Sequence, residues 1–209
     1  MPENDRPPRP ELITFDLGNV LTLVDERPAI RELARLSNRD EQAVFDACYS
    51  PAAKRVLETG QVTWREFVAR VERTLGFRLA FERFLEIFES SLTPNRPIFG
   101  LVEAVAARYR VALCSNTSEP HWLLEKGRLP FGRRFDPAIV SYEIGVMKPD
   151  REIYDAISDR SGIPHARIVF IDDIPANVEG ARKTGIQAVQ FTGVARLRSD
   201  LAALGVEAG

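Results

Sequence analysis

Several reactive side chains in this sequence lie at or near the points where short apolar runs end. They are Asp16 in "ELITFDLGNVL", Ser115 and Asn116 in "RVALCSNT", Asp172 and Asp173 in "RIVFIDD", and, between the last two runs, Lys148 in "GVMKPD". Each group alone has an ordinary explanation, because a polar residue after a strand is often a turn former or a helix cap. Their combination, however, brings together carboxylates, a hydroxyl and an ammonium group.

These side chains suit one kind of chemistry if the fold gathers them. Carboxylates in close proximity raise one another's pKa unless a cation neutralises them. Oxygen ligands of this kind suit Mg²⁺, which prefers a few carboxylates together with water and substrate phosphate. Lys148 would add a second positive charge, and Ser115 and nearby backbone N–H groups could donate to phosphate oxygens. The set predicts a site for a phosphate dianion beside a carboxylate nucleophile.

The elements that must position these residues follow from the pattern along the chain. After about residue 96, segments with helical periodicity alternate with short apolar runs typical of buried strands: 98–109 helix, 110–116 strand, 119–127 helix, 137–141 strand, 150–162 helix, 167–173 strand, 175–185 helix and 186–191 strand. This alternation indicates βαβ units and a parallel sheet. In such sheets ligands bind at the carboxyl ends of the strands, which is where the reactive residues lie.

The segment between the first strand and this region has a different pattern. Residues 24–92 carry helical periodicity with almost no strand signal, and Thr63 with Glu66 matches a capping box. The predicted fold class is therefore α/β, a doubly wound parallel sheet with an inserted small helical cap. We assign residues 11–22 and 96–209 to the core, residues 23–95 to the cap, and the Pro-rich residues 1–10 to a flexible tail.

Composition excludes other classes of protein. Of the 209 residues 28 are basic and 30 are acidic, giving a net charge of −2, which does not favour nucleic-acid binding. No apolar stretch is long enough to span a membrane, and the N-terminus has no apolar region of the kind a secretory signal needs. The two cysteines, Cys48 and Cys114, lie in apolar segments and are expected to be reduced core residues, which favours a cytoplasmic protein.

The same residues resemble the motifs of the haloacid dehalogenase (HAD) superfamily, in the family's order. "FDLGNVL" is similar to motif I, "LCSNT" to motif II, "GVMKPDREIY" to motif III and "FIDDIPANVEGARKTGI" to motif IV. The helical insertion after motif I resembles the family's C1 cap. The "DLGNV" and "DDxxxN" forms are similar to a subgroup that includes a bacterial sugar-1-phosphate phosphatase and the phosphatase domain of soluble epoxide hydrolase.

The resemblance implies a role for each matching residue. Asp16 would attack phosphorus to form an aspartyl-phosphate, with Lys148 limiting charge repulsion. The other implied roles are Mg²⁺ binding by Asp16, the Gly18 carbonyl and Asp173, support of that metal by Asp172 and Asn177, and phosphate binding by Ser115, the Asn116 backbone N–H, Lys148 and Asn19.

One position departs from the family pattern. Phosphatases of the family usually carry a second aspartate two residues after the nucleophile, which protonates the leaving group and then activates water, and here that position is Gly18. Such acid–base help is worth about 10²–10⁴ in rate. A substrate with a good leaving group could dispense with it, or Asp25, Glu58 or His121 could supply it from near the cleft.

The function predicted from the sequence is a magnesium-dependent phosphatase for a small phosphorylated metabolite such as a sugar phosphate, acting as a monomer or homodimer. Two alternatives stay open: a catalytically weak HAD-like protein that binds phosphorylated ligands, which Gly18 favours, and a 2-haloacid dehalogenase, which the acidic pair at 172–173 argues against. A response-regulator receiver is excluded because its acidic pair precedes the phosphoaccepting aspartate.

Overall fold

The computed structural model describes residues 8–207. The predicted tail lies mostly outside these residues, at positions 1–7. Of the remaining tail residues, Pro10 is buried and the Pro8 carbonyl accepts a hydrogen bond from Gln187 Nε2 at 3.0 Å. The described fold therefore includes residues 8–10.

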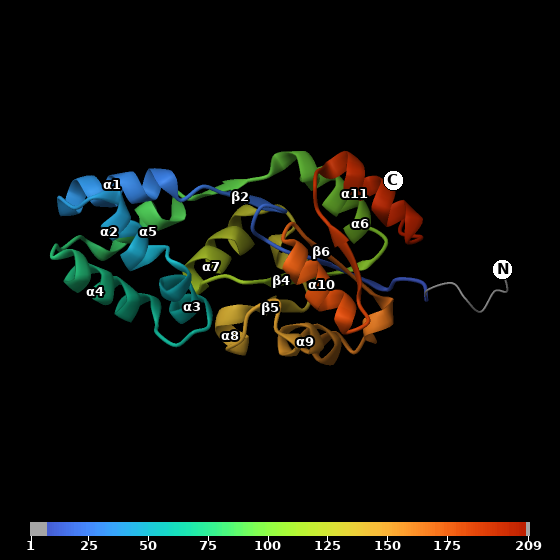
Figure 1. Ribbon diagram of the computed structural model, residues 1–209. Coiled ribbons are helices and arrows are strands. Elements are labelled where there is room, and N and C mark those ends of the chain that lie inside the picture. Colours follow the sequence, from blue (N-terminus) through green and yellow to red (C-terminus); the bar gives the residue numbers. More distant parts are fainter. Residues whose placement is uncertain (1–7, 208–209) are drawn as a thin grey trace.

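A five-stranded sheet forms the centre of the larger part of the molecule (Figure 1). All its neighbouring strands are parallel, in the order β5 (Ala138–Val140), β4 (Arg110–Ser115), β1 (Leu12–Phe15), β6 (Ile168–Asp172) and β7 (Gln187–Gln190). The first strand of the chain is thus the middle strand of the sheet. This order brings the ends of β4, β1 and β6 side by side, as the sequence predicts.

Helices cover both faces of this sheet. Alternate residues of each strand point to opposite sides, so both faces carry apolar side chains that the helices bury. Ile13 and Phe15 belong to one apolar cluster and Leu12 to another. The first cluster includes residues of α6 (Phe99–Ala106), α7 (Glu119–Arg128) and α11 (Val194–Ala203), and the second includes residues of α9 (Arg151–Ser161) and α10 (Pro175–Lys183). The predicted doubly wound α/β fold is confirmed.

Five further helices lie at one end of the molecule (Figure 1) and share an apolar core of their own. They are α1 (Arg27–Ser37), α2 (Glu41–Cys48), α3 (Pro51–Glu58), α4 (Trp64–Leu75) and α5 (Phe81–Glu89). The predicted capping box is present at the start of α4, where the Thr63 hydroxyl accepts from the Glu66 N–H and the Glu66 carboxylate accepts from the Thr63 N–H. We call α1–α5 the helical segment.

Two short strands connect the helical segment to the sheet. β2 (Thr22–Val24) and β3 (Leu92–Pro94) pair in antiparallel fashion, and the sequence pattern did not predict them. Besides this ribbon, α3 packs against α8 (Ser141–Ile144) and α5 packs against α7. Gly60, just after α3, has φ +66°, and a Cβ at this position would lie 2.3 Å from the Tyr142 carbonyl oxygen. Only glycine permits this approach, which brings the end of α3 against the core.

Cys48 and Cys114 are both buried and neither forms a disulfide, as the sequence predicts. Among residues 8–207, we find no helix whose length and apolar character would let it cross a bilayer.

Candidate active site

The register of the central strands gathers the reactive residues at one edge of the sheet. Phe15 pairs with Leu113 on one side and Ile171 on the other, so Asp16 lies level with Cys114 and Asp172. The Asp16 N–H continues the ladder by donating to the Ile171 carbonyl at 2.9 Å. The ends of three strands that are far apart in the sequence, β1, β4 and β6, therefore lie side by side at Asp16.

Lys148 connects these strand ends through its ammonium group. Its Nζ lies 2.8 Å from Asp16 Oδ1 and 2.6 Å from Asp172 Oδ2, and it donates to the Cys114 carbonyl at 3.0 Å. The lysine is only 4% exposed, so its charge is compensated by two carboxylates inside the protein. Burying a charge is costly unless it is paired and hydrogen-bonded in this way.

Asn116 positions Lys148 through the backbone. Its side-chain Oδ1 accepts from the Lys148 N–H at 2.8 Å, and its Nδ2 donates to the Lys148 carbonyl at 3.0 Å. The sequence predicts only a backbone role for Asn116 in phosphate binding. Its side-chain contacts depend on the loop before α9 folding back over β4, for which the sequence offers no local signal.

The two adjacent aspartates have different surroundings. Asp172 is fully buried, and besides Lys148 it accepts hydrogen bonds from Asn177 Nδ2 (3.1 Å) and the Ile174 N–H (2.8 Å). Asp173 is partly exposed, lines a cavity and receives a side-chain hydrogen bond from Asn19. Asp173 therefore presents its carboxylate to the cavity, whereas Asp172 is occupied by protein partners.

The donor set fits a hard divalent cation. Carboxylate oxygens of Asp16, Asp172 and Asp173 lie within 4.8 Å of one another. Because the oxygens of Asp172 already accept from an ammonium, an amide and an N–H, Asp16 and Asp173 are the pair that could ligate Mg²⁺. Gly18 lines the same cavity and could add its carbonyl oxygen. Oxygen-only donors with room for water and phosphate are typical of magnesium sites.

The pKa values reflect burial and crowding of like charges. Burial raises the pKa of Asp16 to about 6, against the opposing effect of Lys148, and the charge of Asp172 raises it further. Burial alone would lower the pKa of Lys148, but Asp16 and Asp172 together raise it above its ordinary value. Burial and then the charge of Asp172 raise the pKa of Asp173. The site therefore holds more negative charge than one lysine neutralises, which favours cation binding.

A cavity of about 320 Å³ opens from these residues toward the helical segment. Ser115, whose hydroxyl hydrogen-bonds to Asp16, lies on the sheet side. The lining on the side of the helical segment includes Glu58, which the sequence suggested as a residue near the cleft. The other lining residues on this side were not predicted: Glu26, Cys48, Tyr49, Lys54, Leu57 and Phe88. The Tyr49 hydroxyl is buried and has no hydrogen-bond partner within residues 8–207. The cavity thus joins a charged sheet edge to a wall of mixed polarity.

The three residues suggested as acid–base candidates lie in different places. Asp25 is not part of the cavity lining and forms an ion pair with Arg27 at 2.8 Å. His121 lines the cavity, but its ring stacks on Phe88 at 4.1 Å and its Nε2 lies 3.3 Å from the Phe88 carbonyl. Glu58 lines the cavity from the end of α3.

The partly buried ring of His121, stacked on Phe88, predicts a pH dependence of stability. Burial lowers its pKa to about 4, so between about pH 6.5 and 4 the unfolded chain binds a proton that the folded chain excludes. The contribution of neutral His121 is therefore complete above about pH 6.5 and is lost as the pH falls toward 4. Denaturant unfolding over this range should show a smaller loss of stability for His121→Phe, which keeps the stacking on Phe88, than for the parent protein. Parallel pH curves for the two proteins would contradict this assignment.

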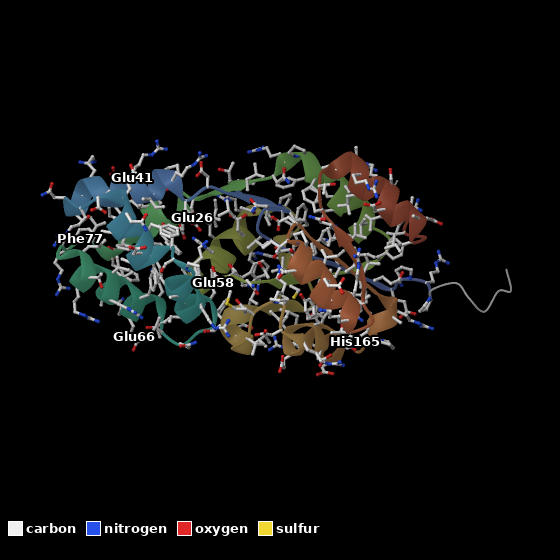
Figure 2. The ribbon with its side chains drawn as sticks, in the orientation of Figure 1. Glu26, Glu41, Glu58, Glu66, Phe77 and His165 are labelled. Atoms are coloured by element: carbon white, nitrogen blue, oxygen red, sulfur yellow. The ribbon has the colours of Figure 1, made fainter. Side chains whose placement is uncertain are left out.

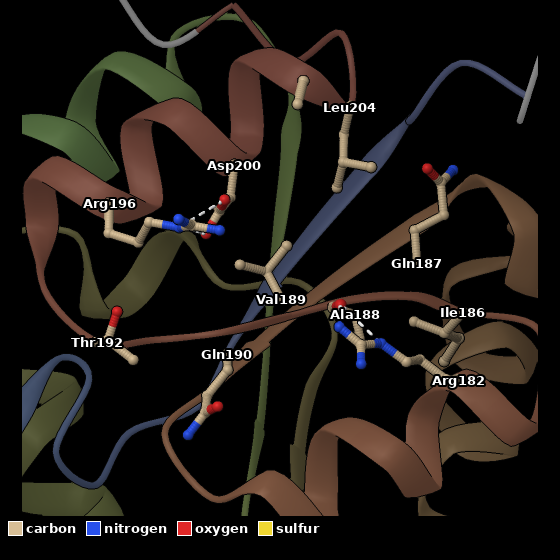
Figure 3. Close-up of a pocket in the computed structure, with 11 residues that line it drawn as sticks. Arg182, Ile186, Gln187, Ala188, Val189, Gln190, Thr192, Arg196, Asp200 and Leu204 are labelled. Carbon is tan, nitrogen blue, oxygen red and sulfur yellow. Dashed lines mark hydrogen bonds and ion pairs between the residues drawn. The ribbon is translucent and has the colours of Figure 1, made fainter.

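A second hollow, of about 670 Å³, lies on the outer edge of the sheet along β7 (Figure 3). The charged side chains that line it have partners: Arg196 pairs with Asp200 at 2.9 Å, and Arg182 donates to the Ala188 carbonyl at 2.8 Å. It is larger than the cavity at the strand ends but is separate from Asp16 and Lys148. We therefore take the smaller cavity as the candidate active site.

Known proteins are similar to this chain in sequence and in fold. The chain is 27% identical over 202 residues to D-ribitol-5-phosphate phosphatase of Bacteroides thetaiotaomicron, covering 90% of this chain and 95% of that enzyme. It is 29% identical over 124 residues to a phosphorylated carbohydrates phosphatase of Thermotoga maritima, covering 59% and 56%. A HAD family enzyme of B. thetaiotaomicron, solved with magnesium and inorganic phosphate, has the same fold, with a TM-score of 0.76 at 24% identity over 87% of this chain and 93% of that one.

The family itself follows from the extent of the match. A family model described as haloacid dehalogenase-like hydrolase matches residues 10–185, from the first strand of the sheet to the end of α10. This range includes every residue of the sheet edge described above. Since the match extends over far more than half of this sequence, the chain belongs to the haloacid dehalogenase-like hydrolases.

Proposed function

We propose that the protein is a magnesium-dependent phosphatase that hydrolyses small phosphomonoesters through an aspartyl-phosphate on Asp16. The observation that carries this proposal is the convergence of Asp16, Lys148 and Asp173 on one cavity. Lys148 Nζ lies 2.8 Å from Asp16, and the carboxylates of Asp16 and Asp173 lie within reach of a single cation. The family and its phosphatase members support the same reaction class.

In the first half of this reaction, an oxygen of the Asp16 carboxylate attacks phosphorus and the bond from phosphorus to the leaving oxygen breaks. Lys148 keeps Asp16 ionised and reduces the repulsion between this carboxylate and the incoming phosphate. The Ser115 hydroxyl and the Asn116 N–H, which follow from the same strand end, would donate to phosphate oxygens. Mg²⁺ held by Asp16, the Gly18 carbonyl and Asp173 would supply further positive charge toward the phosphate. In the second half, water attacks the aspartyl-phosphate and releases inorganic phosphate.

The helical segment limits the size of the substrate in this proposal. Residues of α2, α3 and α5 line the cavity opposite Asp16, so we assign α1–α5 the role of a cap over the site. A cavity of about 320 Å³ suits a small metabolite. Relatives named for ribitol 5-phosphate and for phosphorylated carbohydrates support a sugar or polyol phosphate as the substrate.

A screen of phosphorylated metabolites tests the proposal directly. Release of inorganic phosphate is measured for a panel of sugar, polyol, nucleotide and amino-acid phosphates, with Mg²⁺ and with excess EDTA. We expect turnover of at least one sugar or polyol phosphate with Mg²⁺, its loss in EDTA, and recovery when Mg²⁺ is restored. Thermal unfolding in EDTA provides the control that the fold survives chelation.

Other outcomes of the screen distinguish the rival functions. Halide release from a 2-haloacid that persists in EDTA would identify a dehalogenase. Stabilisation of the protein by phosphorylated ligands without turnover on any of them would identify a binding protein. Either result would overturn the proposed phosphatase.

A further inference from the structure

Hydrolysis of an alkyl phosphate needs a proton source that the strand-end residues do not supply. The departing alkoxide is a strong base, and protonating it in the transition state is worth about 10²–10⁴ in rate. Asp16 is the nucleophile in the proposed reaction, Lys148 is held by two carboxylates, and Asp173 faces the cation. Gly18 has no side chain. The acid must therefore come from another residue of the cavity.

Glu58 differs from the other carboxyl groups of the cavity, because Asp16, Glu26 and Asp173 each have a side-chain partner. It lines the cavity together with Asp16, and within residues 8–207 it forms no hydrogen bond or ion pair. It is the last residue of α3, and Figure 2 shows it at the border between the helical segment and the sheet. The packing of α3 on α8 and the close approach of Gly60 to Tyr142 hold this end of the helix against the core. A carboxyl group so placed, without a hydrogen-bond partner among the described residues, is free to bind a proton or a substrate oxygen.

Enclosure in the cavity, more than the neighbouring charges, favours the protonated form of Glu58. Burial raises its pKa to about 7. Lys54 on the same helix opposes this shift, Glu26 before α1 and Asp16 at the end of β1 strengthen it, and Lys148 opposes it weakly. Acids with a pKa near the working pH are the most effective proton donors and acceptors.

We propose that Glu58 is the general acid and base of this enzyme, a role that rests on the phosphatase proposed above. As the bond from Asp16 to phosphorus forms and the bond from phosphorus to the leaving oxygen breaks, the Glu58 carboxyl gives its proton to that oxygen, which departs as an alcohol. The resulting carboxylate then takes a proton from water as the water oxygen attacks the aspartyl-phosphate. Inorganic phosphate leaves, and Asp16 and protonated Glu58 are regenerated.

Leaving groups of different basicity test this assignment. For Glu58→Gln, kcat/KM with an alkyl phosphate such as ribitol 5-phosphate should fall by about 10² or more, because the alkoxide leaves unprotonated. With p-nitrophenyl phosphate, whose leaving group needs no proton, kcat/KM should change by less than about threefold. The same variant should release a burst of one p-nitrophenolate per enzyme, because the second step lacks its base. Glu41→Gln, an exposed cap residue labelled in Figure 2, is the matched control and should match the parent protein on both substrates.

A restored carboxyl group provides the second arm of the test. A Cβ built on Gly18 would meet only Val24 Cγ2, at an ordinary 3.6 Å, so Gly18→Asp is sterically acceptable. In the Glu58→Gln background, Gly18→Asp should raise kcat/KM for the alkyl phosphate at least about tenfold, because it returns an acid to the same cavity. A folded double variant as slow as Glu58→Gln would count against proton supply as the contribution of Glu58.

Equal losses on both substrates, a rise in KM alone, or no change on either would overturn the role of Glu58 as acid and base. None of these results would contradict the proposed function, because the parent protein would still hydrolyse both esters. Conversely, a parent protein inactive toward every phosphomonoester in Mg²⁺ would remove the proposed function and this inference together.

Discussion

Asp16→Asn is expected to abolish phosphatase activity, lowering kcat by a factor on the order of 10⁴–10⁶. The neutral amide is a poor nucleophile, so the covalent step through the aspartyl-phosphate cannot start. The fold should persist, because asparagine has the same shape and can still accept the hydrogen bonds that reach Asp16 from the Leu17 N–H and Lys148. Lys148 also keeps its contact with Asp172 at 2.6 Å. Release of inorganic phosphate from the best substrate measures the loss, and thermal unfolding checks the fold.

Asp159→Asn is the matched control for this experiment, since Asp159 is exposed on α9 and lies outside the cavity lining. It should retain the activity of the parent protein. If Asp16→Asn hydrolysed phosphate esters at the parent rate, Asp16 would not be the nucleophile. A variant that lost its cooperative unfolding would instead have to be replaced by Asp16→Glu, which lengthens the carboxylate and should also be inactive.

Lys148→Met is expected to have the largest effect on stability. It leaves the carboxylates of Asp16 and Asp172 buried without their cation, and removing one partner of a buried ion pair costs about 3–5 kcal/mol. Methionine keeps most of the length and apolar surface of the lysine, so the loss reports the charge and not a cavity. Denaturant unfolding without Mg²⁺ measures this loss in the free energy of unfolding. Phosphatase activity should fall as well, since the nucleophile loses the group that limits repulsion.

Two further variants test whether the loss of stability in Lys148→Met comes from its buried ion pairs. Lys183→Met removes an exposed lysine of α10 and should change stability by less than about 0.5 kcal/mol. Asp172→Asn in the Lys148→Met background removes one of the two unpaired carboxylates and should return part of the lost stability. Strict additivity of the Lys148 and Asp172 effects would mean that the two side chains do not interact energetically.

The alternation of apolar runs and amphipathic segments determined most of the core. A central strand of a parallel sheet is buried on both faces, so β1, β4 and β6 appear in the sequence as continuous apolar runs. Since each run ends in a polar residue, the sequence alone predicts that Asp16, Ser115 and Asp172 lie at the same edge of the sheet. The elements it missed are short or only weakly patterned: β2 and β3, each of three residues, and the helices α8 and α11.

The difference between Asp172 and Asp173 depended on the tertiary structure. Consecutive residues after a strand can point either way, and family resemblance alone indicated which aspartate faces the metal. In the structure Asp172 is enclosed by Lys148, Asn177 and the Ile174 N–H, so Asp173 presents the available carboxylate.

The wall of the cavity was decided only by the packing of the helical segment on the core. Helical periodicity shows which face of α3 is apolar, but Glu58 is its last residue, and its direction depends on contacts of α3 with α8 far along the chain. The sequence by itself thus determined the five strands of the sheet and their reactive ends, because these follow from local patterns of burial. Which side chains face Asp16 across the cavity, Glu58 among them, was settled by long-range packing, which no local pattern encodes.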